Sequence, residues 1–296
     1  MKIIVTGSLG HISRPIVQKL SAANHDVTVI SSNADRKAEI EALGAKAAIG
    51  SVSDLAFLTE TFRDADVVYT MVPPTFAAAD WKKHIAGIGK IYAQAIAAAG
   101  VKNVVNLSSI GAHMPDGCGP VSGLYHVEQA LNALEGVNVK HLRPGFFYYN
   151  FLANIGMIKQ MGIIGGNYGD GTKLVIADTT DIGEVAADEL VNLSFTGKSV
   201  RYIVSDEKTT DEIATILGKA IGKPDLKWVN FSDEDTIGGM LQNGVPEGVA
   251  ENYAEMGAAM RSGEMAAEYM VSRAATFGKT NLEAFAPVFA GAYSQA

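Results

Sequence analysis

Short apolar runs alternate with longer amphipathic stretches through the first half of this chain. Apolar runs of roughly 4–8 residues are typical of buried strands, and stretches with apolar residues at every third or fourth position are typical of helices. The pattern predicts strands at residues 2–5, 26–30, 45–49, 67–71, 104–107 and 139–142. It predicts helices at residues 13–23, 35–43, 54–62, 81–99 and 125–134. This alternation indicates an α/β fold with a doubly wound parallel sheet.

The pattern changes after Arg143, Pro144 and Gly145. Residues 146–171 are rich in Gly, aromatic residues and Met, and their periodicity is less regular. Beyond residue 171 the sequence pattern predicts helices that begin near Asp181, Thr209 and Ser232. It also predicts strands at residues 200–204 and 226–231. We therefore expect a first domain at residues 1–150 and a smaller mixed α/β region at residues 151–296, with segments that return to the sheet.

The junction between the first strand and the first helix carries the strongest chemical signal. Gly7 allows a tight turn, Gly10 lets the backbone approach a phosphate, and Ser13 takes the third small position, where helix packs on strand. The helix N-terminus then presents N–H groups and a positive dipole end to an anion. This is the dinucleotide-binding loop of a Rossmann domain, with Ile12 placed to cover one face of a nicotinamide. The predicted contacts are Thr6, Gly7, Leu9, Gly10, His11 and Ile12.

The end of the second strand indicates which dinucleotide binds. Sites specific for NAD usually place a carboxylate there, on the ribose 2′-hydroxyl. Here Ser31, Ser32 and Asn33 offer hydrogen bonds to a 2′-phosphate and Arg36 offers positive charge. The alternative is that Arg36 and Lys37 are solvated residues in the first turn of the next helix. We expect NADP(H) in preference to NAD.

The ends of the other strands complete the predicted cofactor site, because a doubly wound sheet binds its ligand at the carboxyl ends of its strands. Residues after the third strand are placed near the adenine, and residues after the fourth and fifth strands are placed near the ribose and nicotinamide. Asp54 is expected to cap the helix that follows it. The predicted contacts are Ser51, Val52, Met71, Val72, Pro73, Ser108 and Ser109.

Composition narrows the class of protein. The 296 residues include 24 Lys and Arg against 32 Asp and Glu, a formal net charge of −8, which argues against a general binder of nucleic acid or of anionic membranes. A single cysteine, Cys118, fits a reducing compartment, and the spacing of His, Cys and Asp residues suits no metal site. No apolar run approaches the roughly 20 residues of a membrane span, and Met1 and Lys2 lead directly into a strand. We therefore expect a cytoplasmic protein.

Several motifs resemble one family. They are Thr6-Gly7-x-x-Gly10, the segment from Leu107 to Ala112, the segment from Leu142 to Phe147 with Asn150, Asp181-Ile182-Gly183 with Ala186, and the segment from Asp211 to Ala214. In order and spacing they resemble the NmrA-like family, atypical members of the short-chain dehydrogenase/reductase superfamily. The resemblance spans nearly the whole chain. It implies a Rossmann NAD(P) domain with a small C-terminal substrate region, in a family of NADPH-dependent reductases and of sensors that bind dinucleotide without turnover.

The chain departs from typical short-chain dehydrogenases at their Tyr-x-x-x-Lys pair. The residue four positions after Tyr125 is Gln129, and the other possible register places Pro120 and Leu124 at the pair. A tyrosine donates the proton in those enzymes, and the lysine lowers its pKa. The candidate proton donors here are therefore His126, Tyr125 and Tyr148. Each has a plain alternative, since His126 suits a helix surface and the tyrosines suit a core.

Two functions remain open. The first is an NADP(H)-dependent oxidoreductase that acts on a small apolar or aromatic carbonyl or quinone, which the aromatic segment after Gly145 favours. The second is a redox sensor without catalytic activity that regulates a partner protein, which the missing Tyr-Lys pair favours. An epimerase-like activity on a nucleotide sugar ranks third, because that chemistry depends more heavily on the missing pair.

Overall fold

The computed structural model describes residues 1–272 and 275–296, and its centre is a parallel sheet. In order along the sheet, its eight strands are β13 (Ala275–Phe277), β10 (Lys198–Val204), β6 (Asn138–Pro144), β5 (Asn103–Leu107), β4 (Val67–Thr70), β1 (Lys2–Val5), β2 (Asp26–Ser31) and β3 (Lys46–Ile49). The strand order reverses between β1 and β4, as it does in a doubly wound sheet. The predicted fold class is confirmed.

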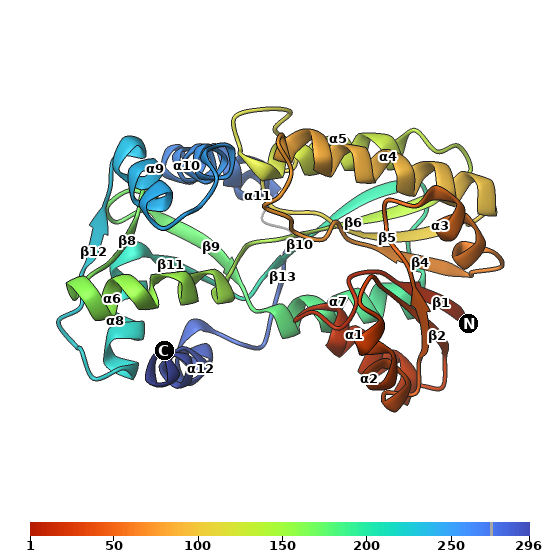
Figure 1. The fold of residues 1–296 in the computed structure, drawn as a ribbon, viewed down its shortest axis with the longest axis horizontal. Helices are drawn as coiled ribbons and strands as arrows, with labels where there is room; N and C mark the ends of the chain where they lie inside the picture. The colour runs from red at the N-terminus through yellow and green to blue at the C-terminus, as the bar shows by residue number, and fades with distance from the viewer. Residues whose placement is uncertain (273–274) are drawn as a thin grey trace.

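Helices cover both faces of this sheet (Figure 1). On one face α3 (Leu55–Phe62), α4 (Trp81–Ala99) and α5 (Pro120–Asn132) pack side by side. On the other lie α1 (Ser13–Ala22), α7 (Thr179–Asn192) and α2 (Lys37–Ala42), which follows the short 3₁₀ helix η1 (Ala34–Arg36). Successive residues of β1 are buried in different layers, because side chains alternate across a strand: Ile3 and Val5 pack with α1 and α7, and Ile4 packs with α4.

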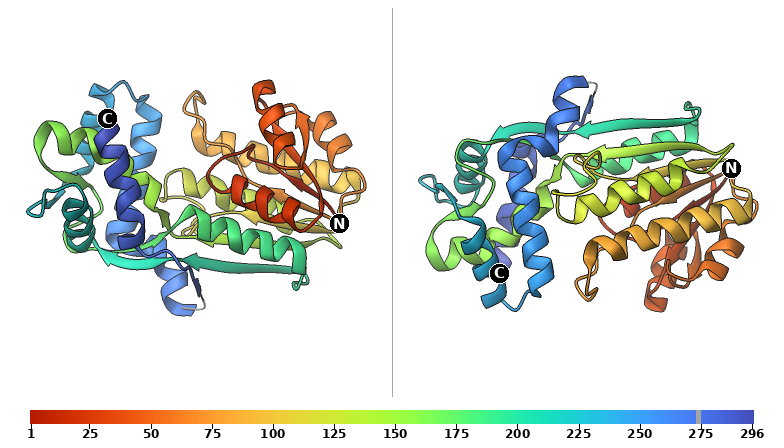
Figure 2. Two further views of the ribbon diagram at one scale, coloured as in Figure 1. Left: turned by 90° about the horizontal axis from the view of Figure 1, so that it is seen from below. Right: turned by 90° about the horizontal axis from the view of Figure 1, so that it is seen from above.

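The rest of the chain forms a lobe at the end of the molecule opposite the N-terminus (Figure 2). It contains a three-stranded sheet of β7 (Phe146–Phe147), β9 (Lys173–Ala177) and β11 (Asp206–Thr209), and a pair of β8 (Ile164–Gly166) and β12 (Trp228–Asn230). Its helices are η2 (Tyr148–Asn154), α6 (Ile155–Met161), α8 (Thr210–Ala220), α9 (Asp233–Gln242), α10 (Glu247–Ser262), η3 (Glu264–Ala266), α11 (Ala267–Ser272) and α12 (Leu282–Gln295). Between these elements the chain returns to the main sheet as α7, β10 and β13.

The main error in predicting the helices concerns the start of α5. The sequence pattern predicts that it begins at Tyr125, whereas it begins at Pro120. Gly123 weakens the helical pattern there, but it is a packing residue, because a Cβ on it would lie 2.8 Å from α4. Gly89 of α4 is equally close to α5, since a Cβ on it would lie 2.8 Å from the Cα of Val127. Close contact between the two helices therefore outweighs the low helix propensity of glycine.

The helix predicted near Asp181 is α7, and its N-cap is Asp178, which accepts a hydrogen bond from the Thr180 N–H at 2.7 Å. Asp181 itself is buried inside the helix. Its carboxylate accepts hydrogen bonds from the Ser205 hydroxyl at 2.7 Å and the Thr280 N–H at 3.0 Å. Asp181 thereby ties α7 to the segment that leads into α12. The helix starts predicted at Thr209 and Ser232 are confirmed as the caps of α8 and α9.

Candidate functional site

The loop between β1 and α1 has the geometry of a phosphate cradle. Gly7 has a positive φ of 86°, and the Gly10 N–H donates to the Gly7 carbonyl at 3.2 Å, which closes the turn. The Thr6 hydroxyl accepts from the Met71 N–H at 2.8 Å and so ties the loop to the end of β4. Among the described residues no side chain caps the start of α1, and the Arg14 N–H donates to the Gly10 carbonyl at 2.9 Å. The positive end of the helix dipole at the Ile12–Ser13 turn is therefore not occupied by a side-chain oxygen. The residues present therefore fit a dinucleotide pyrophosphate.

Ser13 replaces the third glycine of the motif without loss of close packing. Its hydroxyl donates to the Thr6 carbonyl at 3.0 Å, and the side chain is buried. A Cβ on Gly7 would lie 2.6 Å from the Ser13 oxygen, so the serine fits only because residue 7 is glycine. Gly183 of α7 supports the same region, because a Cβ there would lie 2.9 Å from the Ile12 carbonyl oxygen. Strand, loop and two helices are thus packed tightly around the predicted cradle.

The other predicted contacts in this loop divide between core and surface. Leu9 and Ile12 are buried in the layer shared by α1 and α7, whereas Gly10 and His11 are exposed. The His11 ring stacks on Tyr149 of η2, with ring centroids 4.0 Å apart and an interplanar angle of 28°. The structure therefore brings the glycine loop into contact with the aromatic segment of the C-terminal lobe.

Two arginines meet at the end of β2. The carboxylate of Glu39 accepts hydrogen bonds from Arg36, at 2.5 Å, and from Arg14 of α1. These hydrogen bonds, first that of Arg14 and then that of Arg36, lower the pKa of Glu39. We call these three residues the arginine cluster. Arg36 is therefore paired rather than simply solvated, and Arg14 is a cation that sequence reasoning missed, although it directly follows the glycine loop.

The hydroxyls beside the arginine cluster form a chain. The Ser8 hydroxyl donates to the Ser31 hydroxyl at 3.0 Å, and the Ser31 hydroxyl donates to the Asn33 carbonyl at 3.2 Å. Ser32 is exposed, and the Asn33 side chain caps η1 by accepting from the Asp35 N–H. Two guanidinium groups and one carboxylate leave a net charge of +1 near these hydroxyls, which suits a phosphate better than an uncharged ribose hydroxyl.

The ends of β3 and β4 hold the remaining predicted contacts. Ser51 is exposed with its hydroxyl 2.7 Å from the Ser53 hydroxyl, and Val52 is half-buried. Asp54 caps α3, as expected from the sequence. Met71 has its N–H bonded to Thr6 and its carbonyl bonded to the Tyr92 hydroxyl, at 2.6 Å. The loop that continues through Val72 and Pro73 is therefore anchored at its start.

A buried ionic network lies behind the end of β5, and sequence reasoning missed it. The Ser108 hydroxyl donates to Glu128 of α5 at 2.5 Å, and Arg143 donates to both oxygens of that carboxylate at 2.9 and 2.6 Å. Arg143 also bonds to Tyr202 and Glu268. Burial opposes the charge of Arg143, but the Glu128 carboxylate raises its pKa above the ordinary value. The only sequence signal was the presence of Ser108 and Arg143 within the family motifs.

This network limits what the two strand-end serines can do. The Ser108 hydroxyl hydrogen goes to Glu128, and the Ser109 hydroxyl donates to the Ile110 carbonyl at 2.9 Å. With their hydrogens used inside the protein, both serines are acceptors toward a ligand. They suit the hydroxyls of a ribose or the N–H groups of a carboxamide, and not a carbonyl that needs a donor.

The three candidate proton donors occupy different environments. Tyr148 is fully buried, and its hydroxyl donates to the Thr280 carbonyl at 3.0 Å. Burial is the main cause that raises the pKa of the Tyr148 hydroxyl, and nearby carboxylates such as that of Asp206 raise it further. Tyr148 is therefore a weak acid in the core of the lobe. Tyr125 is half-buried on α5, and His126 is exposed with its ring edge-on to Tyr125 at 5.2 Å. The structure does not gather these three side chains at one point.

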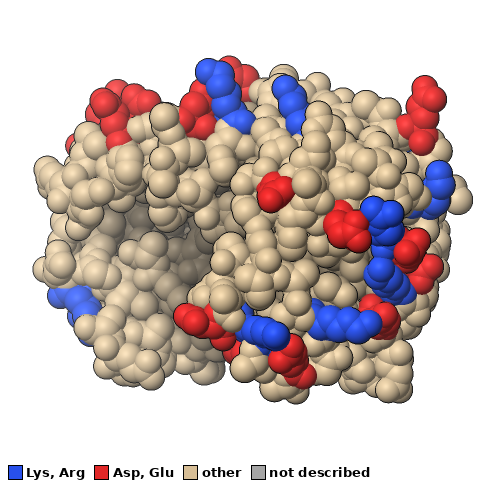
Figure 3. All heavy atoms as spheres, turned by 45° about the vertical axis from the view of Figure 1, so that its right-hand side comes forward, with Lys and Arg blue, Asp and Glu red and all other residues tan. Residues whose placement is uncertain are grey.

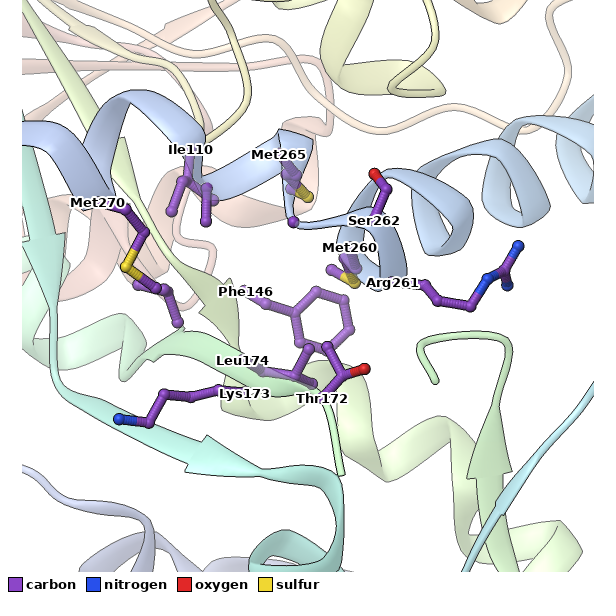
Figure 4. Close-up of a pocket in the computed structure, with 13 residues that line it drawn as sticks. Ile110, Phe146, Thr172, Lys173, Leu174, Met260, Arg261, Ser262, Met265 and Met270 are labelled. Atoms are coloured by element: carbon purple, nitrogen blue, oxygen red, sulfur yellow. The ribbon is translucent and has the colours of Figure 1, made fainter. Parts of the chain in front are cut away.

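A cavity of about 330 Å³ lies between β9 and the helices α10, η3 and α11 (Figure 4). Ile110 and Phe146, which follow the ends of β5 and β6, contribute to its wall. The remaining lining residues are Thr172, Lys173, Leu174, Val175, Met260, Arg261, Ser262, Gly263, Met265, Ala266 and Met270. A space-filling view shows a hollow toward the C-terminal lobe that is bordered mainly by uncharged side chains (Figure 3).

Among residues 1–272 and 275–296, no helix is both long and apolar enough to cross a membrane. The same residues contain no group of three or more His, Cys, Asp or Glu side chains arranged to hold a metal ion.

Comparison with known proteins places the chain in a family. Residues 1–285 match the model of the NmrA-like family. An NAD(P)H azoreductase of Xenophilus azovorans is 24% identical over 86% of this chain and 85% of its own length. The solved structure of an NADPH-dependent quinone oxidoreductase from Escherichia coli, complexed with NADPH, superposes with a TM-score of 0.81 at 22% identity and covers 99% of both chains. A Citrobacter triphenylmethane reductase complexed with NADP(H) gives 0.80 at 20% identity, covering 98% of this chain and 100% of its own. The chain belongs to the NmrA-like family.

Proposed function

We propose that this protein is an NADP(H)-dependent oxidoreductase that reduces a small apolar or aromatic carbonyl compound or quinone. The observation that carries the proposal is the pairing of an uncapped, glycine-lined helix start with the arginine cluster at the end of β2. The names of similar proteins support it, since they include an NADPH-dependent quinone oxidoreductase and an NAD(P)H azoreductase.

The residues present suggest how the dinucleotide would be held. Gly7, Gly10 and the start of α1 would bind the pyrophosphate. The arginine cluster and the exposed Ser32 would bind the 2′-phosphate, because the Ser31 hydroxyl already donates to the Asn33 carbonyl. Ser51 and Val52 would adjoin the adenine. The segment from Met71 to Pro73 and the acceptor oxygens of Ser108 and Ser109 would border the nicotinamide riboside. When bound, NADPH supplies a hydride, so that a quinone, NADPH and one proton give a hydroquinone and NADP⁺.

The chain's own contribution to this reaction is positioning and exclusion of water. Ile12 is buried beneath the phosphate loop and supports it from the layer of α1 and α7, and the stacked pair of His11 and Tyr149 joins that loop to the lobe. A quinone needs little further polarisation, and its proton can come from water or from a side chain at the mouth of the site. Tyr125 and His126 are the candidates for that role, because the Tyr148 hydroxyl is already bonded to Thr280.

The proposal is tested by calorimetric titration with NADPH, NADP⁺, NADH and NAD⁺, followed by NADPH oxidation with a panel of quinones and aromatic aldehydes. We expect binding that favours the phosphorylated pair, and turnover with at least one quinone. Gly10→Leu should abolish both, because its side chain would occupy the phosphate cradle. Gly156→Leu is the matched control, since Gly156 lies in α6 with open space around it. Tight NADPH binding without turnover of any acceptor would refute the oxidoreductase.

A second candidate function is a dinucleotide sensor that regulates a partner protein. The observation that favours it is the commitment of the Ser108 and Ser109 hydroxyl hydrogens inside the protein, together with the absence of a Tyr-Lys pair at Tyr125 and Gln129. A sensor predicts that NADPH and NADP⁺ change the affinity for a captured partner by different factors. Capture that does not depend on the dinucleotide would reject this alternative.

A further inference from the structure

We infer that the cavity between β9 and the α10–η3–α11 segment binds a neutral aromatic molecule of one or two rings. On the function proposed above, this molecule is the acceptor itself. The inference names the substrate class and the residues that select it, and it rests on the position, lining and size of the cavity.

The position of the cavity connects it to the carboxyl edge of the sheet. Ile110 lies two residues beyond Ser108, and its N–H donates to the Pro144 carbonyl at 2.9 Å, which continues the pairing of β5 with β6. Phe146 directly follows Gly145, whose N–H donates to the Ile203 carbonyl at 3.0 Å. Two wall residues of the cavity are therefore held by the strand ends themselves. In doubly wound sheets, ligands bind along this edge.

The lining is apolar and adaptable. Met260, Met265 and Met270 surround the cavity together with Phe146 and Leu174 (Figure 4). The Phe146 ring is fixed by edge contacts to two other aromatic rings, with centroids 5.5 and 5.6 Å away. Methionine sulfurs contact aromatic rings favourably, and their flexible side chains adjust to flat ligands of different outline. This combination suits a planar aromatic compound.

The polar residues at the cavity select against a charged ligand. Arg261 and Lys173 line its edge, but their side chains point away from its centre (Figure 4). The Arg261 guanidinium donates to Asp233 at 3.0 and 3.1 Å, and the Lys173 ammonium lies 3.3 Å from the Glu207 carboxylate. The remaining polar side chains of the lining are the neutral hydroxyls of Thr172 and Ser262. A carbonyl oxygen can accept from the Thr172 hydroxyl, since the Ser262 hydroxyl already donates to the Ala259 carbonyl at 3.2 Å. A phosphate ester or carboxylate would lack a free cation.

The volume sets the upper limit of ligand size. At about 330 Å³ the cavity lies at the lower end of the range of roughly 300–1,000 Å³ that small-molecule sites occupy. A benzoquinone or naphthoquinone fits such a volume. A dye with three separate aryl groups, as reduced by the Citrobacter relative, requires more space.

The test uses two adjacent alanines. Ala266 lines the cavity and is half-buried, whereas Ala267 is exposed and outside the lining, so Ala266→Phe should fill the cavity and Ala267→Phe is its matched control. Binding of 2-methyl-1,4-naphthoquinone is measured by equilibrium dialysis without cofactor, and NADPH affinity is measured in parallel to verify the fold. We expect Ala266→Phe to weaken naphthoquinone binding at least about tenfold with NADPH affinity unchanged, a loss typical of blocking an apolar pocket.

A variant that enlarges the cavity tests the same inference in the opposite direction. Met270→Ala should improve binding of the three-ring 9,10-anthraquinone relative to the naphthoquinone. The inference is overturned if the wild-type protein does not bind the naphthoquinone, or if Ala266→Phe binds it as well as Ala267→Phe does. Cavity-dependent binding without NADPH oxidation would retain the ligand site and reject the oxidoreductase. NADPH oxidation with naphthoquinone that is equal in both alanine variants would retain the oxidoreductase and reject this site.

Discussion

Glu39 occupies the two arginines that the proposed 2′-phosphate site would use, so its charge should weaken NADPH binding. Glu39→Gln removes one negative charge from the arginine cluster and changes its net charge from +1 to +2. All three side chains are roughly 40% exposed, so each of the two ion pairs is weak. Releasing Arg14 and Arg36 from Glu39 should therefore tighten NADPH binding by a factor on the order of 2–10.

The assay is a calorimetric titration of wild type and Glu39→Gln with NADPH and NADH at two salt concentrations. NADPH affinity should rise, NADH affinity should not change, and the gain should shrink in high salt because these groups are exposed. Glu41→Gln is the control, since Glu41 lies on the same helix and pairs only distantly with Lys37, at 3.9 Å. Adding Arg36→Ala should abolish most of the gain. An equal gain for both dinucleotides, or no gain for NADPH, would refute the assignment of the cluster to the 2′-phosphate.

Three further predictions concern packing and charge. Gly183→Leu should lower NADPH affinity at least about tenfold, because a Cβ at this position would press on Ile12 and Pro15 at the start of α1. The measurement is a calorimetric titration, and unchanged affinity would show that α7 does not support the loop. Glu128→Gln should lower the free energy of unfolding in urea by up to about 3 kcal/mol, since the buried Arg143 would keep only the half-exposed Glu268 as its counter-charge, and adding Arg143→Met should restore much of it. Burial lowers the pKa of His141 to about 4, so stability that is complete above the ordinary pKa of about 6.5 should be lost as the pH falls through 4. His141→Gln should flatten this part of the stability profile, and an identical profile would contradict the prediction.

Much of the nucleotide-binding half followed from the sequence because its signals are local. The apolar run of β1, the turn at Gly7 and the amphipathic start of α1 depend on neighbouring residues, so periodicity and turn chemistry are sufficient to predict them. The same holds for the caps at Asp54 and Thr209, where the acceptor and donor are three residues apart. The lack of a carboxylate at the end of β2 was also visible, since Ser31 directly ends that strand.

The tertiary structure decided which distant residues meet. Arg14 and Glu39 come from different helices, and Arg143 pairs with Glu268 across 125 positions, so no local pattern predicts either contact. The packing of α5 on the sheet placed Glu128 behind Ser108, where it accepts the serine's hydroxyl hydrogen. Packing also gave two neighbouring tyrosines different environments, because Tyr148 lies in the core and Tyr149 stacks on His11.

The cavity too depends partly on local sequence and partly on tertiary structure. The sequence shows several Met residues between positions 256 and 270, and a Met-rich segment is equally suited to a core or a partner surface. Only the return of the chain through β9 and α10 placed Met260 and Met265 opposite Ile110 and Phe146 at the strand ends. Local sequence therefore determined the elements and the phosphate loop, because short-range sterics and hydrogen bonds specify them. Charge pairing and pocket shape were decided by topology, because they depend on side chains that only the folded sheet brings within contact distance.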